Sequence, residues 1–415
     1  MTGPPYSLIS SGIGRLHFVE ASKAIASAGC SVRFLTGWVP NAGWKSTANF
    51  LGRLVGRENL YDRLAARNIG SLAGIDVVTL PWHEAAAQIA YYAGTAGLLP
   101  QGRMQASTWR MFGSASSRFL DDIDVVHVRS GGGFGIIDEA RRRNIPVIVD
   151  HSIAHPAFMR DNLGDLFRSH GLKFDLGPDD PFWKRVLDDC DRADIVLVNS
   201  DFVKQTFIEA GYDEDRIRVI YLGYPDTFLR AKANYSRGEC LNLLFTGNFC
   251  LRKGAQIVAE VLSILDAKGF KYHLDILGDS TEGGHLLAAQ AAKGGVTLHG
   301  FVPHDVLRRY LQKADIYFFP TLAEGCAKSA MEAMAAGLPI VTTIACGLPG
   351  DNGLHFVAPK VSDGLSFSKI IQDLSMSTGS RSSLGISASN LVTAKYDWSA
   401  YGLSVLALYK SLINP

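Results

Sequence analysis

Two glutamates, Glu324 and Glu332, stand in the part of the chain with the clearest potential for chemistry, YFFPTLAEGCAKSAMEAMAAGLPIVTT. The pattern predicts an apolar strand, a loop, a short helix that stops at Gly337, and a second strand. Glu324 falls on the loop, and Glu332 falls about one turn or more inside the helix. Two carboxylates at this constrained spacing suit two sets of hydroxyl groups.

The predicted helix would also present unsatisfied amides at its N-terminus, where the helix dipole attracts phosphate. These amides belong to Cys326, Ala327 and Lys328, which follow the turn at Gly325. The arrangement suits a sugar nucleotide, with one carboxylate for the sugar, one for the ribose, and amides for the diphosphate between them. In the competing interpretation, the first glutamate caps the helix electrostatically and the second faces water.

A second candidate site follows the apolar strand of CLNLLFTGNFCLRKGAQIVAEVLSILDAKG, residues 240–269. Arg252 and Lys253 stand at the start of its predicted helix, where the macrodipole disfavours cations. A bound diphosphate would explain the pair. The alternative is a solvated basic pair whose charge is screened by water.

EGCAKSAME resembles the E-x7-E signature of the retaining family-four glycosyltransferases of the GT-B fold. The resemblance implies that Glu324 contacts the donor sugar and that Glu332 contacts the nucleotide ribose.

The loop after the strand of residues 240–269 resembles the same family's phosphate-binding loop. Gly247 and Lys253 match that loop, which implies donor binding. Asn248 stands where many members have Arg, and Arg252 is the candidate replacement. Gly278 ends the next strand where members have a glycine near the nucleotide, although a glycine there is also typical of a simple turn.

The N-terminal half repeats the alternation of strand and helix. In YSLISSGIGRLHFVEASKAIASAGCSVRFLTG, Gly12 and Gly14 follow the first strand. The resemblance implies a loop that leaves space for donor phosphate or acceptor, and a tight turn is the alternative. His151 follows the strand of NIPVIVDHSIAHP, where open parallel sheets form ligand crevices. It resembles the family's histidine near the transferring sugar, whereas a hydrogen-bonded structural histidine is the competing interpretation.

The predicted fold class is α/β, with two Rossmann-like doubly wound domains facing a central cleft. We expect an acceptor-binding domain at residues 1–232 and a nucleotide-sugar domain at 233–395. Residues 396–415 resemble the family's last helix, which crosses back to the first domain. The boundary rests on the loss of apolar periodicity in LRAKANYSRGEC.

The composition excludes several classes of function. A net charge of +1 and a pI near 7.7 give no support for a nucleic-acid partner. The six cysteines are scattered, and His151 and His155 lack an H-E-x-x-H context, so no metal site is expected. We expect no cofactor beyond the nucleotide sugar. The N-terminus lacks the pattern of a signal peptide, which favours the cytoplasm.

Residues 41–73 alternate aromatic and leucine side chains with arginines. A basic amphipathic segment can lie on an anionic membrane, so a peripheral membrane contact is one hypothesis. The other is an inserted helical pair that packs on the first domain.

Taken together, these patterns predict a retaining, metal-independent hexosyltransferase that uses a nucleotide-diphosphate sugar and an unidentified acceptor. Lys253 and Arg252 would stabilise the leaving diphosphate. A sugar-nucleotide epimerase of the same architecture and a catalytically silent sugar-nucleotide-binding protein are the two alternatives.

Overall fold

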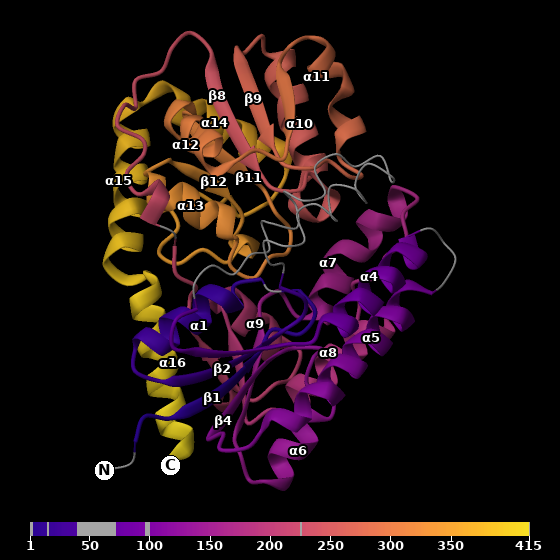
Figure 1. Ribbon diagram of the computed structural model, residues 1–415. Coiled ribbons are helices and arrows are strands. Elements are labelled where there is room, and N and C mark those ends of the chain that lie inside the picture. The colour runs from indigo at the N-terminus through magenta and orange to yellow at the C-terminus, as the bar shows by residue number, and fades with distance from the viewer. Residues whose placement is uncertain (1–2, 15, 40–71, 96–99, 225, 415) are drawn as a thin grey trace, which may run out of the picture. The chain divides into compact units, whose positions relative to one another are not determined.

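The computed structural model describes residues 3–14, 16–39, 72–95, 100–224 and 226–414 (Figure 1). The described chain forms two compact units. Unit 1 comprises Met1–His151, Pro178–Leu197 and Gly402–Pro415, and unit 2 comprises Ser152–Gly177 and Val198–Tyr401. Nearly all of the segment 41–73 lies outside the described residues, so the membrane hypothesis for that segment stays a prediction.

The first sheet has seven strands in the order β3-β2-β1-β4-β5-β6-β7. The pairs β3–β2, β2–β1, β1–β4 and β4–β5 are parallel. Four central strands are almost wholly buried, as expected for strands that helices cover on both faces. The strands are β1 Tyr6–Ser10, β2 Ser31–Thr36, β3 Ile75–Thr79, β4 Val125–Arg129, β5 Val147–His151, β6 Ile195–Val198 and β7 Ile217–Val219.

Helices connect these strands in the alternation that the sequence predicts. In Figure 1, α1 lies to one side of β1 and β2, and α5 and α8 lie to the other side. The helices are α1 Phe18–Ser27, α4 Pro81–Thr95, α5 Gln101–Ser116, α6 Ile136–Arg142, α7 Pro156–Ser169, α8 Pro181–Arg192 and α9 Asp201–Glu209, with short 3-10 turns at η2 Ser117–Phe119, η3 Glu214–Arg216 and η4 Asp226–Phe228.

The second sheet has five parallel strands in the order β10-β9-β8-β11-β12. Its strands are β8 Leu241–Thr246, β9 Tyr272–Leu277, β10 Val296–Gly300, β11 Ile316–Phe319 and β12 Ile340–Thr342. Its other elements are η5 Leu251–Lys253, α10 Ala255–Ala267, η6 Gly284–Leu287, α11 Ala288–Ala292, α12 His304–Lys313, α13 Lys328–Ala336, η7 Ile344–Cys346, α14 Gly364–Met376 and α15 Thr378–Lys395. The apolar face of α10 packs into the core of this unit.

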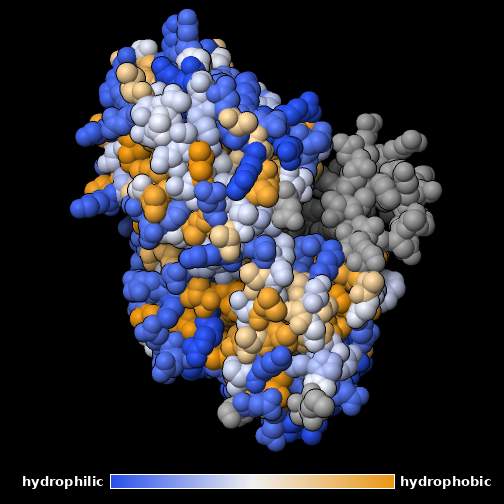
Figure 2. All heavy atoms as spheres, turned by 90° about the vertical axis from the view of Figure 1, so that its left-hand side faces the viewer, coloured by the Kyte–Doolittle hydropathy of each residue, from blue (hydrophilic) through white to orange (hydrophobic). Residues whose placement is uncertain are grey.

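The last helix, α16 Trp398–Ile413, begins in unit 2 and belongs to unit 1 from Gly402 onward. Gly402 packs closely on α1, because a Cβ there would lie 2.2 Å from the carbonyl oxygen of Ala24. Tyr409 is buried and bonds His127 of β4. The opposite face of α16 is in water, and the view onto its side of the molecule shows apolar side chains interspersed with hydrophilic ones (Figure 2).

The prediction of two parallel α/β sheets is confirmed. The residue boundaries stay a prediction, and the described contacts add one difference: Ser152–Gly177 and Val198–Tyr401 form unit 2 together. The segment LRAKANYSRGEC, where the domain boundary was expected, is bonded to the end of α13, since the amides of Arg230 and Lys232 bond the carbonyls of Ala335 and Ala336 at 2.8 Å.

Candidate active site

The loop that carries Glu324 is held by backbone contacts on both sides. The Glu324 amide bonds the carbonyl of Ala345 at 3.0 Å, and a Cβ on Gly347 would lie 1.7 Å from the carbonyl oxygen of Gly325. A Cβ on Gly325 would itself lie 2.1 Å from the carbonyl oxygen of Ser152. Two glycines therefore let three backbone segments meet here, which fixes the direction of the glutamate.

Glu324 lies between the two predicted cations. Its Oε1 is 2.9 Å from Nη1 of Arg252 and 3.6 Å from Nζ of Lys253. Arg252 also donates to the carbonyl of Ala323. Although burial opposes it, the Glu324 carboxylate raises the pKa of Arg252, so this guanidinium stays charged. The three side chains form a cluster with one surplus positive charge.

The ion pair changes the interpretation of the two cations. They lie in η5, one short turn before α10, and Gly254 separates them from that helix with a left-handed φ of 83°. A side chain at Gly254 would meet the carbonyl oxygen of Pro320 at 2.1 Å. Because the two loops approach closely, the cations lie beside Glu324. The carboxylate therefore offsets part of the positive charge that a bound diphosphate was expected to balance.

Glu332 lies on the buried side of α13, whereas the competing interpretation had placed its side chain in water. It is 8% exposed, and the nearest cation is Nζ of Lys328 at 4.0 Å. Burial raises the pKa of Glu332 against the weaker influence of Lys328. A buried carboxylate with so distant a counter-charge is costly unless hydroxyl or amide donors approach it.

At the N-terminus of α13, fewer backbone amides are available to a ligand than the sequence predicts. The amide of Ala327 bonds the carbonyl of Cys346 at 3.1 Å, so it already has an acceptor, and its contact with a phosphate stays a prediction. The acceptor comes from η7, which follows the next strand along the chain. Within the described residues, the amides of Cys326 and Lys328 have no acceptor, and they stay candidates for a phosphate.

Gly247 of the predicted phosphate loop packs on Lys253 and on Gly278, the glycine that follows the next strand. A Cβ on Gly278 would lie 2.4 Å from the carbonyl oxygen of Gly247, and a Cβ on Gly247 would lie 2.9 Å from Nζ of Lys253. Asn248 is exposed and donates to Thr281 at 3.3 Å. These contacts give the two glycines a packing role, and any contact of theirs with a nucleotide stays a prediction.

In unit 1, His151 ends β5 and is buried. Its Nδ1 lies 3.0 Å from Oγ of Ser130, which follows β4. The neighbouring Asp150 lies 3.0 Å from Nε2 of His17 and 3.4 Å from Nε2 of His127. Although burial opposes it, the two imidazoles hold the pKa of Asp150 well below its usual range.

The glycine loop of unit 1 packs against an aromatic side chain. Gly12 has a φ of 62°, and a Cβ there would lie 2.3 Å from Trp109. Gly14 lies near Arg129, whose Nη1 bonds the carbonyl of Ile13 at 3.1 Å. Burial lowers the pKa of Arg129 to about 10 against the charge of Asp150. The loop is therefore shaped by packing, and its proposed ligand contacts are untested.

Two family models match the chain. Residues 241–374 match the model for glycosyl transferases group 1, and residues 14–228, just over half of the chain, match the model for glycosyltransferase family 4. The chain belongs to glycosyltransferase family 4. Among curated relatives, the amylovoran biosynthesis glycosyltransferase AmsK of Erwinia amylovora is 28% identical over 165 residues, 38% of this chain and 40% of AmsK. The uncharacterized glycosyltransferase MJ1607 of Methanocaldococcus jannaschii is 28% identical over 217 residues, 48% of this chain and 54% of that protein.

The chain spans only about half the length of the curated relatives it matches. Two solved structures cover it almost completely. Anabaena Alr3699/HepE in complex with UDP and glucose has a TM-score of 0.62 at 15% identity, over 98% of this chain and 100% of that one. Sucrose-phosphate synthase from Thermosynechococcus elongatus has a TM-score of 0.67 at 17% identity, over 99% of each chain. These neighbours confirm the GT-B fold class.

The sequence missed several polar residues of this family-4 glycosyltransferase that support the site. Ser200 donates to the carbonyl of Gly325 at 2.6 Å. The hydroxyl of Tyr317 lies 2.9 Å from Thr246 and 2.9 Å from Ser329 on the first turn of α13. Ser200 stands two residues after the end of β6, so the strand-end signal that pointed to His151 could have found it.

Two further findings concern the described residues alone. No group of three or more histidine, cysteine, aspartate or glutamate side chains among them is placed to hold a metal ion. No helix in the described ranges of this glycosyltransferase is long and apolar enough to cross a membrane.

Proposed function

We propose that this family-4 glycosyltransferase moves a hexosyl unit from a nucleotide-diphosphate sugar to an acceptor with retention of configuration. The observation that carries the proposal is the cluster of Arg252, Lys253 and Glu324, which stands at the carboxyl ends of β8 and β11. Open parallel sheets bind their ligands at such strand ends. The cluster offers two cations for a diphosphate and one carboxylate for sugar hydroxyls.

Before the donor binds, Glu324 holds the two cations in place. When the donor enters, its diphosphate becomes the partner of Arg252 and Lys253, and the carboxylate is released to accept hydrogen bonds from sugar hydroxyls. The surplus positive charge of the ligand-free cluster favours entry of the diphosphate, and the sugar hydroxyls then replace the cations as hydrogen-bond partners of the carboxylate.

The two cations differ in their attachment. Arg252 is anchored to the loop through the Ala323 carbonyl. The Lys253 ammonium lies 5.3 Å from the ring centroid of Phe319, and its contact with Glu324 is longer than that of Arg252. Negative charge on the leaving diphosphate grows as the glycosidic bond breaks. The Lys253 ammonium can move toward this growing negative charge. An interaction that strengthens in the transition state raises turnover.

The acceptor oxygen attacks the sugar on the face from which the diphosphate departs, and no enzyme nucleophile takes part. Glu332 serves the ribose, since donor hydroxyls would supply close partners to a buried carboxylate whose nearest cation among the described residues is 4.0 Å away. His151 is proposed to contact the transferring sugar.

The complexes of Alr3699/HepE with UDP and with UDP-glucose make UDP-hexoses the first donors to test. Purified protein is incubated with a panel of nucleotide sugars and candidate glycan acceptors, and release of nucleoside diphosphate is followed. Acceptor-dependent release supports the transferase. A changed sugar without release indicates an epimerase, and binding without turnover indicates a silent binding protein.

The stereochemistry needs its own measurement. Proton coupling at the anomeric carbon of the product, compared with that of the donor, reports retention or inversion. An inverted product would contradict the proposed mechanism while leaving the transferase activity intact.

A further inference from the structure

A small cavity lies in unit 1 at the carboxyl ends of β1 and β4, where open parallel sheets bind their ligands. Its volume is about 200 Å³, room for roughly six or seven water molecules at ~30 Å³ each, which suits a single sugar ring. The lining comes from the glycine loop after β1, the end of β4, and the helices α4 and α5. We call it the Arg129 cavity, and its lining includes Ile13, Ala87, Gln88, Gln105, Trp109 and Arg129.

The charged side chain of the Arg129 cavity is held in one orientation. Arg129 ends β4, and its Nη1 donates to the carbonyl of Ile13 at 3.1 Å. Its guanidinium carbon lies 4.8 Å from the ring centroid of Trp109, which is 4% exposed and packs edge-on against Phe182. A guanidinium held at one corner and against one ring presents its remaining donors in a fixed direction.

This guanidinium has no close counter-charge among the described residues. Asp150 faces Arg129 in the register of β4 and β5, but its carboxylate pairs with His17 and His127 and acts on the guanidinium only from a distance. Burial lowers the pKa of Arg129 to about 10, which leaves the side chain charged at neutral pH. The described residues accept a hydrogen bond from only one of its five N–H donors. A partly enclosed charge with open donors is costly unless an anion enters.

The charge and the lining of the Arg129 cavity select the chemistry of its ligand. The planar fork of a guanidinium pairs bidentately with a carboxylate, whose single charge balances that of Arg129. A phosphate monoester carries nearly two charges, and no second cation lines the cavity within the described ranges. The side-chain amides of Gln88 and Gln105 offer donors and acceptors to hydroxyl groups, and Ile13 and Ala87 offer apolar surface to ring carbons.

The cavity shares a strand end with a residue of the proposed reaction. Ser130 follows Arg129 directly, and its hydroxyl lies 3.0 Å from Nδ1 of His151, which is proposed to contact the transferring sugar. We infer that the Arg129 cavity binds the carboxylate of a uronic acid, which, on the proposed transferase function, is the terminal sugar of the acceptor. Arg129 pairs with the carboxylate, and the two glutamines bond the ring hydroxyls.

Binding of D-glucuronate to the full chain tests this site without any turnover. Saturation-transfer NMR compares its dissociation constant with that of glucuronamide, which has the same ring but no charge. The wild type is expected to bind glucuronate roughly tenfold more tightly, because a hydrogen bond to a charged group stabilises more than one between neutral groups. Arg129→Gln should remove that preference. Gln88→Glu, which places a carboxylate inside the cavity, should abolish glucuronate binding and serves as the second variant if Arg129→Gln does not fold.

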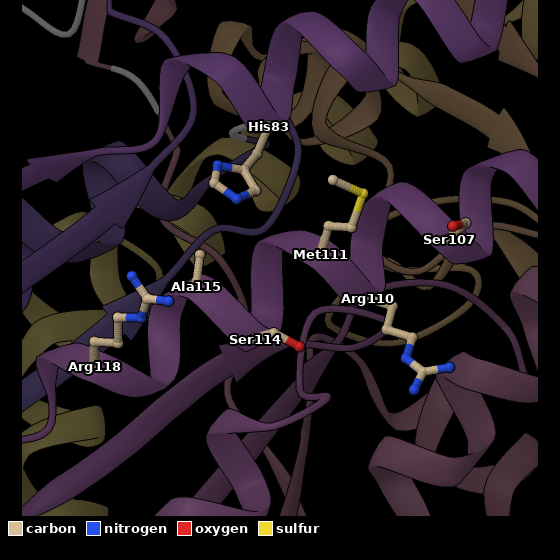
Figure 3. A pocket seen from close by; sticks show the side chains of 7 residues that line it. All are labelled: His83, Ser107, Arg110, Met111, Ser114, Ala115 and Arg118. Atoms are coloured by element: carbon tan, nitrogen blue, oxygen red, sulfur yellow. The ribbon is translucent and has the colours of Figure 1, made fainter.

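A matched control comes from a second hollow of unit 1, of about 520 Å³. His83 and Met111 line it from α4 and α5, and the side chains of Arg110 and Arg118 point apart there, so they do not converge on one ligand (Figure 3). Arg118→Gln removes the same charge as Arg129→Gln and should leave the affinity for glucuronate unchanged. Thermal melts report whether each variant is folded.

Turnover tests the assignment of the uronic acid to the acceptor. With an accepted donor, p-nitrophenyl glucuronide is expected to have a lower KM than p-nitrophenyl glucoside. Arg129→Gln should raise the KM of the glucuronide roughly tenfold and leave the kcat with the glucoside unchanged. Absence of turnover with every donor would contradict the proposed transferase but not the measured binding, and absence of glucuronate binding would leave the transferase standing.

Four results would overturn the inference. Glucuronate could bind no more tightly than glucuronamide, or its binding could survive Arg129→Gln. Glucose 6-phosphate could bind more tightly than glucuronate, or Arg129→Gln could weaken UDP binding as much as glucuronate binding, which would assign the cavity to a phosphate. Equal KM values for the two glycosides would overturn the assignment to the acceptor.

Discussion

The two units of this glycosyltransferase both place charged side chains at the carboxyl ends of parallel strands, but they use them differently. In unit 1, Asp150 is enclosed by His17 and His127, and its side chain is only 5% exposed. In unit 2, Glu324 joins Arg252 and Lys253 with side chains 16 to 22% exposed. A satisfied buried network rigidifies a sheet, whereas a partly open cluster can exchange partners with a ligand.

By this comparison, the charged side chains around Asp150 in unit 1 stabilise the fold, whereas those of unit 2 take part in the chemistry. Removing one of these charges should therefore cost folding free energy in unit 1 and catalytic rate in unit 2. A variant in either set that lowered both the folding free energy and the catalytic rate would show that this division between the units is wrong.

The largest effect on folding is expected for Asp150→Asn. The carboxylate accepts hydrogen bonds from two buried imidazoles, and removing the charged acceptor of such a network costs about 2 to 3 kcal/mol. Denaturant unfolding at neutral pH measures this loss, and Glu324→Gln is the matched variant from unit 2, with a much smaller expected cost. Because the folded pKa of Asp150 is lowered, its stabilisation is present above the ordinary value of 3.8 and is lost as the pH falls through the lowered pKa. An Asp150→Asn protein as stable as the wild type would remove the distinction between the units.

Glu332→Gln is expected to weaken nucleoside diphosphate binding roughly tenfold, by loss of charge-assisted hydrogen bonds. The same change should raise the melting temperature of the ligand-free protein, because burial raises the folded pKa of Glu332 and its ionised form is unfavourable in the folded state. Calorimetric titration and thermal melts measure the two effects.

The pH dependence sharpens this test. Wild-type affinity should fall as the pH drops toward the raised pKa of Glu332, above the ordinary value of 4.5, while the glutamine variant should show no such decline. Parallel pH profiles for the two proteins would contradict the ribose assignment.

Tyr409→Phe should cost about 1 kcal/mol, the usual value of one buried hydrogen bond. The hydroxyl lies 2.7 Å from Nδ1 of His127 and joins α16 to the network of Asp150. Unfolding curves measure the loss, and turnover at a temperature where the variant is folded should be unchanged. A large fall in turnover would mean that the network of unit 1 takes part in the chemistry.

Chelation is expected to have no effect, since side chains and helix amides take the charge of the diphosphate. Turnover is compared before and after treatment with a chelator, with magnesium added back as the control. An absolute requirement for the metal would contradict this account of unit 2.

The sequence predicted unit 2 better than unit 1 for a physical reason. Glu324 and Glu332 stand eight residues apart on one strand-loop-helix segment, so local structure alone fixes their relation. The partnership of His127 with Tyr409 joins residues 282 positions apart, and no local pattern encodes it.

The contacts of unit 2 that the sequence did not predict have the same cause. The ion pair of Arg252 with Glu324 and the bond from the Ala327 amide to Cys346 both depend on how separate loops meet. The sequence identified the residue types at these positions. It could not predict that one cation would already have a partner, or that one amide would already have an acceptor.

The most direct test of the central claim is the turnover of Lys253→Ala with an accepted donor, measured beside nucleoside diphosphate affinity. Lys271→Ala, whose side chain is 72% exposed, is the matched control and should behave as the wild type. The account predicts that Lys253→Ala loses turnover on the order of 100-fold or more, with a smaller change in affinity, because its partner gains charge as the bond breaks. Near-normal turnover in a folded Lys253→Ala protein would contradict the assignment of this cluster to the leaving diphosphate.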